Sequence, residues 1–176
     1  FTFPDQPERG VTYWDWSLVA VKEPSGETRG LVFSLRETTG FRRTELALQE
    51  SERRFRALFD SMFQFIGLLS PDGTLLEANQ AALEAAGIRL EDVQNRPFWK
   101  CRWWTISPET QEQLRTAIER AARGEFIRYE VDLRGAGDRV IPVDFSLKPV
   151  MDSSGNVILL VPEGRGLDEP LLQVVP

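Results

Sequence analysis

The stretch that decides the fold runs from Phe63 to Gly87 and reads FQFIGLL (63–69), SPDG (70–73), TLLEA (74–78), N (79) and QAALEAAG (80–87). Pro71 and Gly73 mark a tight turn, because proline presets φ at the first corner and glycine tolerates a positive φ at the last. The apolar runs on either side therefore predict an antiparallel hairpin. Asn79 can cap a helix with its side-chain oxygen, and Gly87 can end it. The sequence predicts a strand, a turn, a second strand and a short helix, in that order.

The elements expected after this stretch are one long helix and three strands. Ser107, Pro108 and Glu109 predict the start of the long helix, since serine caps, proline suits the first position and an early acid suits the helix dipole. Apolar residues recur at helical spacing until Arg123, and Gly124 closes the helix. A short helical piece is expected near residues 90–93, and strands are expected near residues 125–134, 139–150 and 156–162.

This order of elements resembles that of a PAS domain, in which the second strand ends in an Asn that starts the first helix. The resemblance covers about residues 54–164, and the ordered set of elements carries it rather than any single motif. It implies an α+β fold, the PAS fold, with a five-stranded antiparallel sheet and helices on one face, plus an N-terminal β-hairpin and a linker helix. Three short motifs resemble those of PAS sensor modules in bacterial histidine kinases, namely Pro97-Phe98-Trp99, DFSLKPV at 144–150 and Glu163-Gly164-Arg165.

Composition bounds the number of domains and the kinds of partner. At 176 residues, with 41% hydrophobic and 27% charged residues, the chain is expected to form one domain with attached pieces. A net charge of −6 and a pI near 4.9 offer no basic surface, so we expect no nucleic acid partner and no membrane contact. A single cysteine cannot form an internal disulfide and suits the reducing cytoplasm. The sequence shows no signal peptide and no apolar run near the length of a membrane span.

The first 36 residues repeat a later part of the chain. A shift of 129 residues without a gap matches nine residues, and Trp16 faces Phe145, an aromatic for an aromatic. We therefore expect residues 1–38 to be the C-terminal hairpin of a preceding PAS domain, the alternative being a chance similarity between hairpins. The matched pairs are Asp15 with Asp144, Ser17 with Ser146, Leu18 with Leu147, Val21 with Val150, Ser25 with Ser154, Gly26 with Gly155, Leu31 with Leu160, Val32 with Val161 and Arg36 with Arg165.

A charged, helical stretch follows this hairpin. Phe41, Leu48 and Phe55 share one heptad position, and Leu58 shares the other with two polar residues. Such a helix resembles the signalling linkers that join PAS domains and pair in parallel across a homodimer. The alternative is a solvated connector that packs its few apolar groups on its own domain. The expected domains are the hairpin at 1–38, the linker helix at 39–60, the PAS domain at 61–166 and a tail at 167–176.

The residues available for cofactor chemistry are few. The absence of histidine removes the commonest metal ligand, the usual general base and the proximal ligand of haem-binding PAS domains, so neither a metal nor haem is expected. The tripeptide Lys100-Cys101-Arg102 is similar to the Asn-Cys-Arg motif of light-oxygen-voltage flavin domains. With Asn95-Arg96 as the matching Gly-Arg pair, however, Phe98 takes the reactive position and Cys101 comes three residues late. A covalent flavin is therefore not expected, and Cys101 is predicted to be a small packing residue.

Aromatic residues gather where PAS domains place the helices and loop that cover the cavity. Because aromatic side chains bury a large area, a small apolar or aromatic ligand could bind among them. They could equally fill the cavity themselves, and we favour this second interpretation because aromatic residues near a core are mostly core. The candidate cavity residues are Phe65, Leu83, Phe98, Trp99, Trp103, Trp104, Ile118, Tyr129 and Phe145.

The resemblance implies a noncatalytic sensory or relay module of a bacterial multidomain signalling protein, above all a cytoplasmic two-component sensor histidine kinase with adjacent PAS and kinase or output domains. Ligand occupancy or partner contact would bias the terminal helices. Three alternatives stay open: a flavin-bearing photo- or redox sensor of the same fold, a pure dimerisation scaffold, and an enzyme, for which no nucleophile–base pair is visible. The exit departs from the family, because Gly164-Arg165-Gly166 and then Glu169-Pro170 stand where the family continues into a helix, and this argues against helical output from that end.

Overall fold

The computed structural model describes residues 1–167, and the chain forms two compact units, residues 1–56 and the residues from Ala57 onward. The first unit holds a β-hairpin and the beginning of a long helix that ends in the second unit. The expected tail at 167–176 lies outside the described residues apart from Leu167. The elements of the first unit are the hairpin strands β1 (Trp14–Lys22) and β2 (Thr28–Glu37), the start of the helix α1 (Thr39–Ser61) and one short 3-10 turn (Pro7–Arg9).

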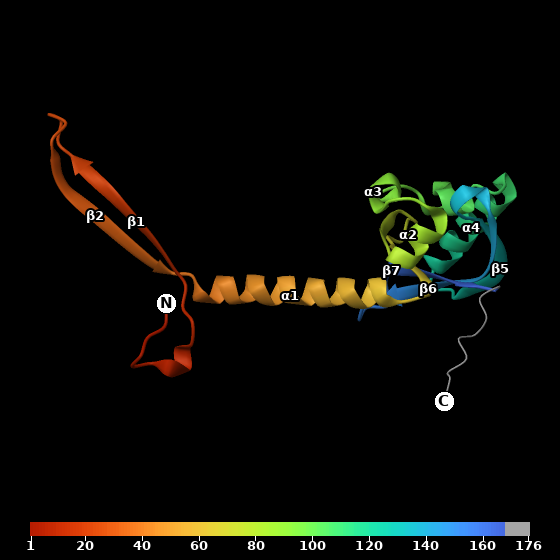
Figure 1. The fold of residues 1–176 in the computed structure, drawn as a ribbon, viewed down its shortest axis with the longest axis horizontal. Helices are drawn as coiled ribbons and strands as arrows, with labels where there is room; N and C mark the ends of the chain where they lie inside the picture. Colours follow the sequence, from red (N-terminus) through yellow and green to blue (C-terminus); the bar gives the residue numbers. More distant parts are fainter. Residues whose placement is uncertain (168–176) are drawn as a thin grey trace. The chain divides into compact units, whose positions relative to one another are not determined.

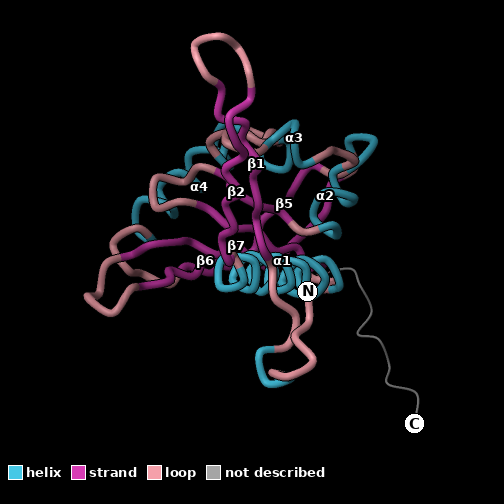
Figure 2. Tube along the Cα trace, turned by 90° about the vertical axis from the view of Figure 1, so that its left-hand side faces the viewer, coloured by secondary structure: helices cyan, strands magenta, loops and turns pink. Residues whose placement is uncertain are grey.

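The hairpin of the first unit is the one that the sequence predicts. Its strands pair antiparallel (Figure 2), and the turn between them contains Gly26 at a φ of 89°, which glycine adopts without strain. A side-chain hydrogen bond ties the start of α1 to the hairpin. The Thr39 hydroxyl accepts it from the Tyr13 amide at 3.0 Å. Thr39 also donates to the Glu37 carboxylate at 2.8 Å, and this hydrogen bond lowers the pKa of Glu37.

The second unit is a five-stranded antiparallel sheet with the strand order β4-β3-β7-β6-β5. Besides the end of α1, residues 57–167 contain three helices and three 3-10 turns, and Figure 1 shows helices α2, α3 and α4 on one face of the sheet. The predicted α+β architecture is thus confirmed. The strands are β3 (Phe65–Leu69), β4 (Leu75–Ala78), β5 (Ile127–Arg134), β6 (Val140–Met151) and β7 (Val157–Gly166). The helices are α2 (Gln80–Ala86), α3 (Leu90–Val93) and α4 (Pro108–Ala121), and the 3-10 turns are Phe98–Lys100, Arg102–Trp104 and Ala136–Asp138.

The local signals of the sequence act as predicted in the second unit. Gly73 has a φ of 83° in the turn between β3 and β4. The Asn79 side chain accepts a hydrogen bond from the Ala82 amide at 3.2 Å and so caps α2. Gly87 ends that helix in the left-handed conformation with a φ of 65°. The Ser107 hydroxyl caps α4 by accepting from the amide of Thr110 at 3.1 Å.

The core lies between the sheet and the helical layer. The apolar face of α4 is buried there through Leu114, Ala117, Ile118 and Ala121, which recur at the spacing of one helix face. Alternate residues of β6 meet this layer, because successive side chains of a strand point to opposite faces of the sheet. The buried residues of β6 are Val143, Phe145 and Leu147.

Candidate ligand cavity

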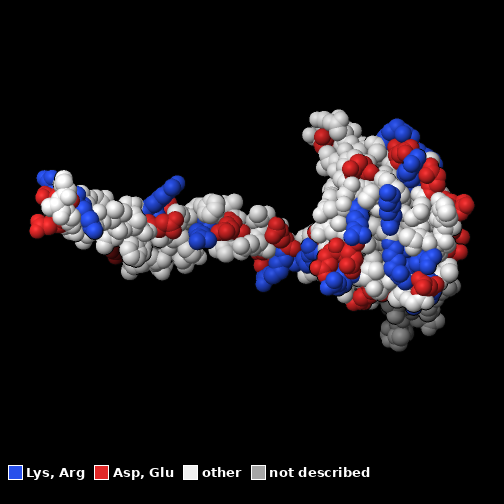
Figure 3. All heavy atoms as spheres, turned by 90° about the horizontal axis from the view of Figure 1, so that it is seen from above, with Lys and Arg blue, Asp and Glu red and all other residues white. Residues whose placement is uncertain are grey.

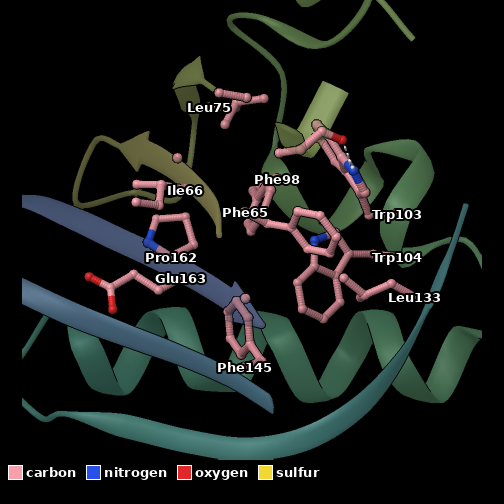
Figure 4. A pocket seen from close by; sticks show the side chains of 14 residues that line it. Phe65, Ile66, Leu75, Phe98, Trp103, Trp104, Leu133, Phe145, Pro162 and Glu163 are labelled. Carbon is pink, nitrogen blue, oxygen red and sulfur yellow. Dashed lines mark hydrogen bonds between the residues drawn. The ribbon is translucent and has the colours of Figure 1, made fainter. Parts of the chain in front are cut away.

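A cavity of about 40 Å³ lies between the sheet and the helical layer of the second unit (Figure 4). Its walls are almost wholly apolar, and they combine aromatic rings, larger aliphatic side chains and four residues with small or no side chains. The aromatic residues are Phe65, Phe98, Trp103, Trp104 and Phe145, the small ones are Gly67, Ala78, Ala82 and Gly164, and the others are Ile66, Leu75, Leu133, Pro162 and Glu163. Figure 4 shows the Glu163 carboxylate extending away from the aromatic rings.

The aromatic residues form a continuous series of ring contacts from the helical layer to strand β5. The ring centroids of Trp103 and Phe98 are 6.0 Å apart, and those of Phe98 and Trp104 are 5.4 Å apart. Trp104 then meets Phe145 edge-on at 5.0 Å, and Phe145 meets Tyr129 at 5.3 Å. Edge-to-face pairs at these distances are favourable beyond the area they bury, so the series holds its members in fixed orientations.

The two tryptophans of this series differ in their hydrogen bonding. The Trp103 indole N–H donates to the carbonyl of Ala82 in α2 at 2.9 Å, which ties the 3-10 turn to that helix (Figure 4). Trp104 is fully buried, and its indole N–H has no partner among the described residues. A buried donor without an acceptor costs about 1–3 kcal/mol, so Trp104 carries a polar group whose hydrogen bond is unmade.

The size of the cavity limits what it can hold in this conformation. A cavity of about 150 Å³ is known to admit benzene, and about 10–15 Å³ is enough to hold one water, so the present 40 Å³ suits only a molecule of a few atoms. A drug-sized ligand would have to displace a side chain, and Phe65 is the aromatic wall residue that is only partly buried.

Five of the nine predicted cavity residues line this cavity, namely Phe65, Phe98, Trp103, Trp104 and Phe145. The other four lie elsewhere in the same unit. Trp99 and Ile118 lie against the turn glycine Gly73, where an added Cβ would be 2.9 Å from each of their side chains. Leu83 packs against the core, and Tyr129 faces a groove beside α4 as well as Phe145.

Sequence reasoning missed the small wall residues, above all Ala78, Ala82, Gly67 and Gly164. These residues contribute to the cavity because their small side chains leave room. The sequence contains no pattern that shows where such room is left. The helix-forming run after Asn79 could have indicated Ala82, since a small residue in the first turn of a capped helix lies close to the strand before it.

Cys101 does not line the cavity. Its side chain is buried, and its sulfur lies 3.6 Å from the carbonyl oxygen of Pro97. Burial raises the pKa of the Cys101 thiol to about 12, so the thiol is protonated at neutral pH and is a poor nucleophile. This environment fits the predicted packing role of Cys101.

The Asn79 side chain joins three elements next to the cavity. Its amide nitrogen donates to the carbonyl oxygens of Phe59 in α1 at 3.2 Å and of Gln64 at 2.8 Å. Its oxygen accepts from the amide of Ile66 in β3 at 3.0 Å, in addition to the capping bond from Ala82. Asn79 is fully buried, and both Ile66 and Ala82 are cavity residues. One side chain therefore links the cavity wall to the last turns of α1.

The surface of the second unit carries charges of both signs. Figure 3 shows basic and acidic side chains interspersed over the face that it presents. Some of these charges form exposed ion pairs, such as Arg102–Asp138 at 3.0 Å, and such pairs contribute little to stability. Among residues 1–167, no three His, Cys, Asp or Glu side chains gather as a metal site would require. None of the helices in that range is long and apolar enough to cross a membrane.

Comparison with known proteins identifies the family. Residues 59–165 match the PAS fold family. The chain belongs to this family. The PAS domain of the HTR-like protein from Haloarcula marismortui superposes with a TM-score of 0.58 at 21% identity, over 72% of this chain and 99% of that one. The strand order and the single-sided helical layer are thus those of a PAS domain.

Two related sequences are those of histidine kinases. The sensor histidine kinase TmoS of Ectopseudomonas mendocina is 43% identical over 120 residues, which are 67% of this chain and 12% of that protein. The hybrid signal transduction histidine kinase D of Dictyostelium discoideum is 42% identical over 128 residues, which are 72% of this chain and 8% of that protein. The chain therefore corresponds to a PAS region that is a small part of much longer kinases.

Proposed function

We propose that this PAS domain is a noncatalytic sensory or relay module of a bacterial two-component sensor histidine kinase, flanked there by further PAS and kinase or output domains. The observation that carries the proposal is the 43% identity to a region of a sensor histidine kinase over a fold that the PAS family shares. The single, buried Cys101 suits the cytoplasm, where a thiol stays reduced.

The structure suggests where a signal would pass. Asn79 lies between the cavity wall and the last turns of α1, so a displacement of Ile66 or Ala82 would change the hydrogen bonds at that end of the helix. A shift between two arrangements of these bonds is the kind of population change by which a sensor can bias a helix.

A chimera tests this proposal. Residues 39–167 replace the matching region of TmoS, and autophosphorylation is measured for the chimera and for its Asn79→Ser and Gln80→Ala forms. We expect the chimera to phosphorylate itself, and Asn79→Ser to change the rate several-fold while Gln80→Ala does not. A rate that is the same in all three forms would contradict a relay through Asn79.

For the cavity, we propose that aromatic side chains fill most of the interior and that any ligand is small. The 40 Å³ volume and the unbroken ring series support this interpretation. Native mass spectrometry of the purified chain, with an absorbance scan of the same sample, tests it. The bare mass without colour is expected. An extra non-covalent mass would establish a ligand, and absorbance beyond the protein band would favour the alternative of a flavin sensor.

We also propose that α1 pairs with the same helix of a second chain. Phe41, Leu48 and Leu58 of the heptad seam are 71%, 60% and 65% exposed, so they lack the cover that such apolar groups find in a parallel pair. Light scattering on the Leu48→Glu variant tests the seam, with Leu46→Glu as a matched control, because Leu46 is 50% exposed but lies outside the seam. We expect Leu48→Glu alone to yield monomers. Equal masses for the two variants would contradict the seam.

A further inference from the structure

The hairpin β1–β2 repeats the geometry of β6–β7 pair by pair. All nine residue pairs of β1–β2 coincide with the nine pairs of β6–β7 after the shift of 129 residues. For example, Asp15 opposite Arg36 matches Asp144 opposite Arg165. The register irregularity also recurs at one place, between Val21 and the next residue in β1 and 129 residues later in β6. Alternating hydrophobicity alone does not fix the position of such an irregularity.

The turns of the two hairpins agree as well. Gly26 and Gly155 have φ values of 89° and 83°. The Glu23 amide donates to the Glu27 carbonyl at 2.8 Å, and the corresponding bond from Asp152 closes the second turn at 2.9 Å. The first hairpin is therefore built as the last hairpin of a PAS sheet, with the same register, irregularity and turn.

The two hairpins differ in what covers them. Strands β6 and β7 each have a neighbour on both sides, whereas β1 and β2 pair only with one another. One face of the first hairpin is a continuous apolar surface, which we call the hairpin face. Its exposed members are Trp16 (68%), Leu18 (52%), Leu31 (64%), Phe33 (60%) and Leu35 (55%). Their counterparts in the second hairpin are buried, namely Phe145, Leu147, Leu160, Pro162 and Gly164.

We propose that the hairpin face is a docking surface for the body of a second PAS fold, encoded in the same polypeptide before Phe1. That body supplies a helical layer over the hairpin face, a strand along the free edge of β1 in the place of β5, and a strand along the free edge of β2 in the place of β3. The proposal requires neither a cavity ligand nor pairing of α1, because it rests on the repeated hairpin alone.

The shapes of the side chains argue against a second copy of this chain as the occupant. Leu35 stands where β7 has Gly164, and a Cβ at Gly164 would lie 3.3 Å from Phe65 of β3, a strand outside the hairpin. The first hairpin also carries Trp14 in the place of Val143. The body that receives the hairpin face must therefore have more room at these positions than the body described here.

The offset predicts where that body begins. The PAS family match starts at residue 59, and 59 minus 129 places the equivalent start about 70 residues before Phe1. The relatives are long enough for such a segment, because this chain spans 12% of TmoS. A chain extended upstream by about 100 residues should contain the whole body, since PAS folds such as this one need roughly that length.

Hydrogen exchange tests the proposal without any substitution. The 176-residue chain and the upstream-extended chain are compared by mass spectrometry on peptides from β1 and β2, with peptides from β6 as an internal standard of folding. We expect protection of β1 and β2 to rise by about 100-fold in the extended chain, because the outward amides of both strands gain partners. Two variants localise the effect: Leu31→Asp on the hairpin face should remove most of this protection, and Val32→Asp on the opposite face should leave most of it.

Two results would overturn the proposal. One is equal protection of β1 and β2 in the two chains while β6 stays protected in both. The other is protection in the 176-residue chain that rises with concentration and is lost in Leu31→Asp, since this would assign the hairpin face to a second copy.

Discussion

Replacing Asn79 by alanine should destabilise the PAS domain more than any other single change in its polar groups. The side chain is fully buried and exchanges hydrogen bonds with the backbone of Phe59, Gln64, Ile66 and Ala82. Alanine keeps the helix but removes every one of these bonds. The perturbation therefore combines the loss of a helix cap with the loss of partners for several backbone groups.

The magnitude follows from these contacts. Loss of an N-cap costs about 1 kcal/mol. A buried backbone group that loses its partner costs about 1–3 kcal/mol, and the Gln64 carbonyl and the Ile66 amide, whose bonds to Asn79 are partly buried, should each lie near the lower end of that range. The expected loss for Asn79→Ala is about 3–4 kcal/mol, a large part of the 5–15 kcal/mol that typically holds a domain together. At a slope of about 1–3 kcal/mol per M, the urea midpoint should fall by about 1–4 M.

The assay is urea unfolding followed by tryptophan fluorescence, which reports the core through Trp103 and Trp104. Asn79→Ser is the informative comparison, because serine caps a helix as well as asparagine but its shorter side chain does not reach the carbonyls of Phe59 and Gln64. We expect serine to recover only about 1 kcal/mol. Gln80→Ala, at an exposed neighbouring position, should change stability by less than about 0.5 kcal/mol. A loss below about 1 kcal/mol for Asn79→Ala, or full recovery with serine, would refute the reasoning.

Three further predictions concern stability. Gly73→Ala and Gly155→Ala both place alanine at a φ of 83°, but only the first is crowded by neighbouring side chains, so its urea midpoint should show at least about 1 kcal/mol more destabilisation. Trp103→Phe should cost about 1 kcal/mol more than Trp104→Phe in the same assay, because only Trp103 donates a hydrogen bond. The Cys101 thiol has a folded pKa of about 12 against 9.0 when unfolded, so the folded state holds the proton longer and stability falls as pH rises above about 9. The wild type should then lose about 1.4 kcal/mol per pH unit more than Cys101→Ala, measured by urea unfolding between pH 8 and pH 11.

Local signals predicted the fold because each acts within a few residues. Gly73 and Gly87 adopt the positive φ values that only a turn or a helix end requires, and Asn79 meets its capping partner three residues later. The shift that aligned Trp16 with Phe145 also predicted a hairpin that is now seen to share its register. None of these inferences depended on contacts between segments that are far apart in the sequence.

The cavity is formed by residues that are far apart in the sequence, and it was predicted only in part. Large aromatic residues are easily recognised in a sequence as candidates for a cavity wall, and Trp103 and Trp104 do line the wall. Trp99 lies four residues before Trp103, yet it turns to the glycine of the β3–β4 hairpin, because 3-10 turns point successive side chains in different directions. The sequence also gave no sign that Asn79 bonds Phe59 at the end of α1 and Met62 just after it, because these residues lie 20 and 17 positions away.

The two hairpins of the chain also differ in the side chains that follow them. After β2, Glu37 accepts from Thr39 and pairs with Arg9 at 2.7 Å, so polar side chains fix the point where α1 begins. After β7 the position that matches Glu37 is Gly166, which has no carboxylate to offer. Leu167, which matches a threonine, instead continues along the sheet by donating its amide to Pro142 at 2.9 Å. The first hairpin thus leads directly into a helix, whereas the residue directly after the second, Leu167, is still bonded to the sheet.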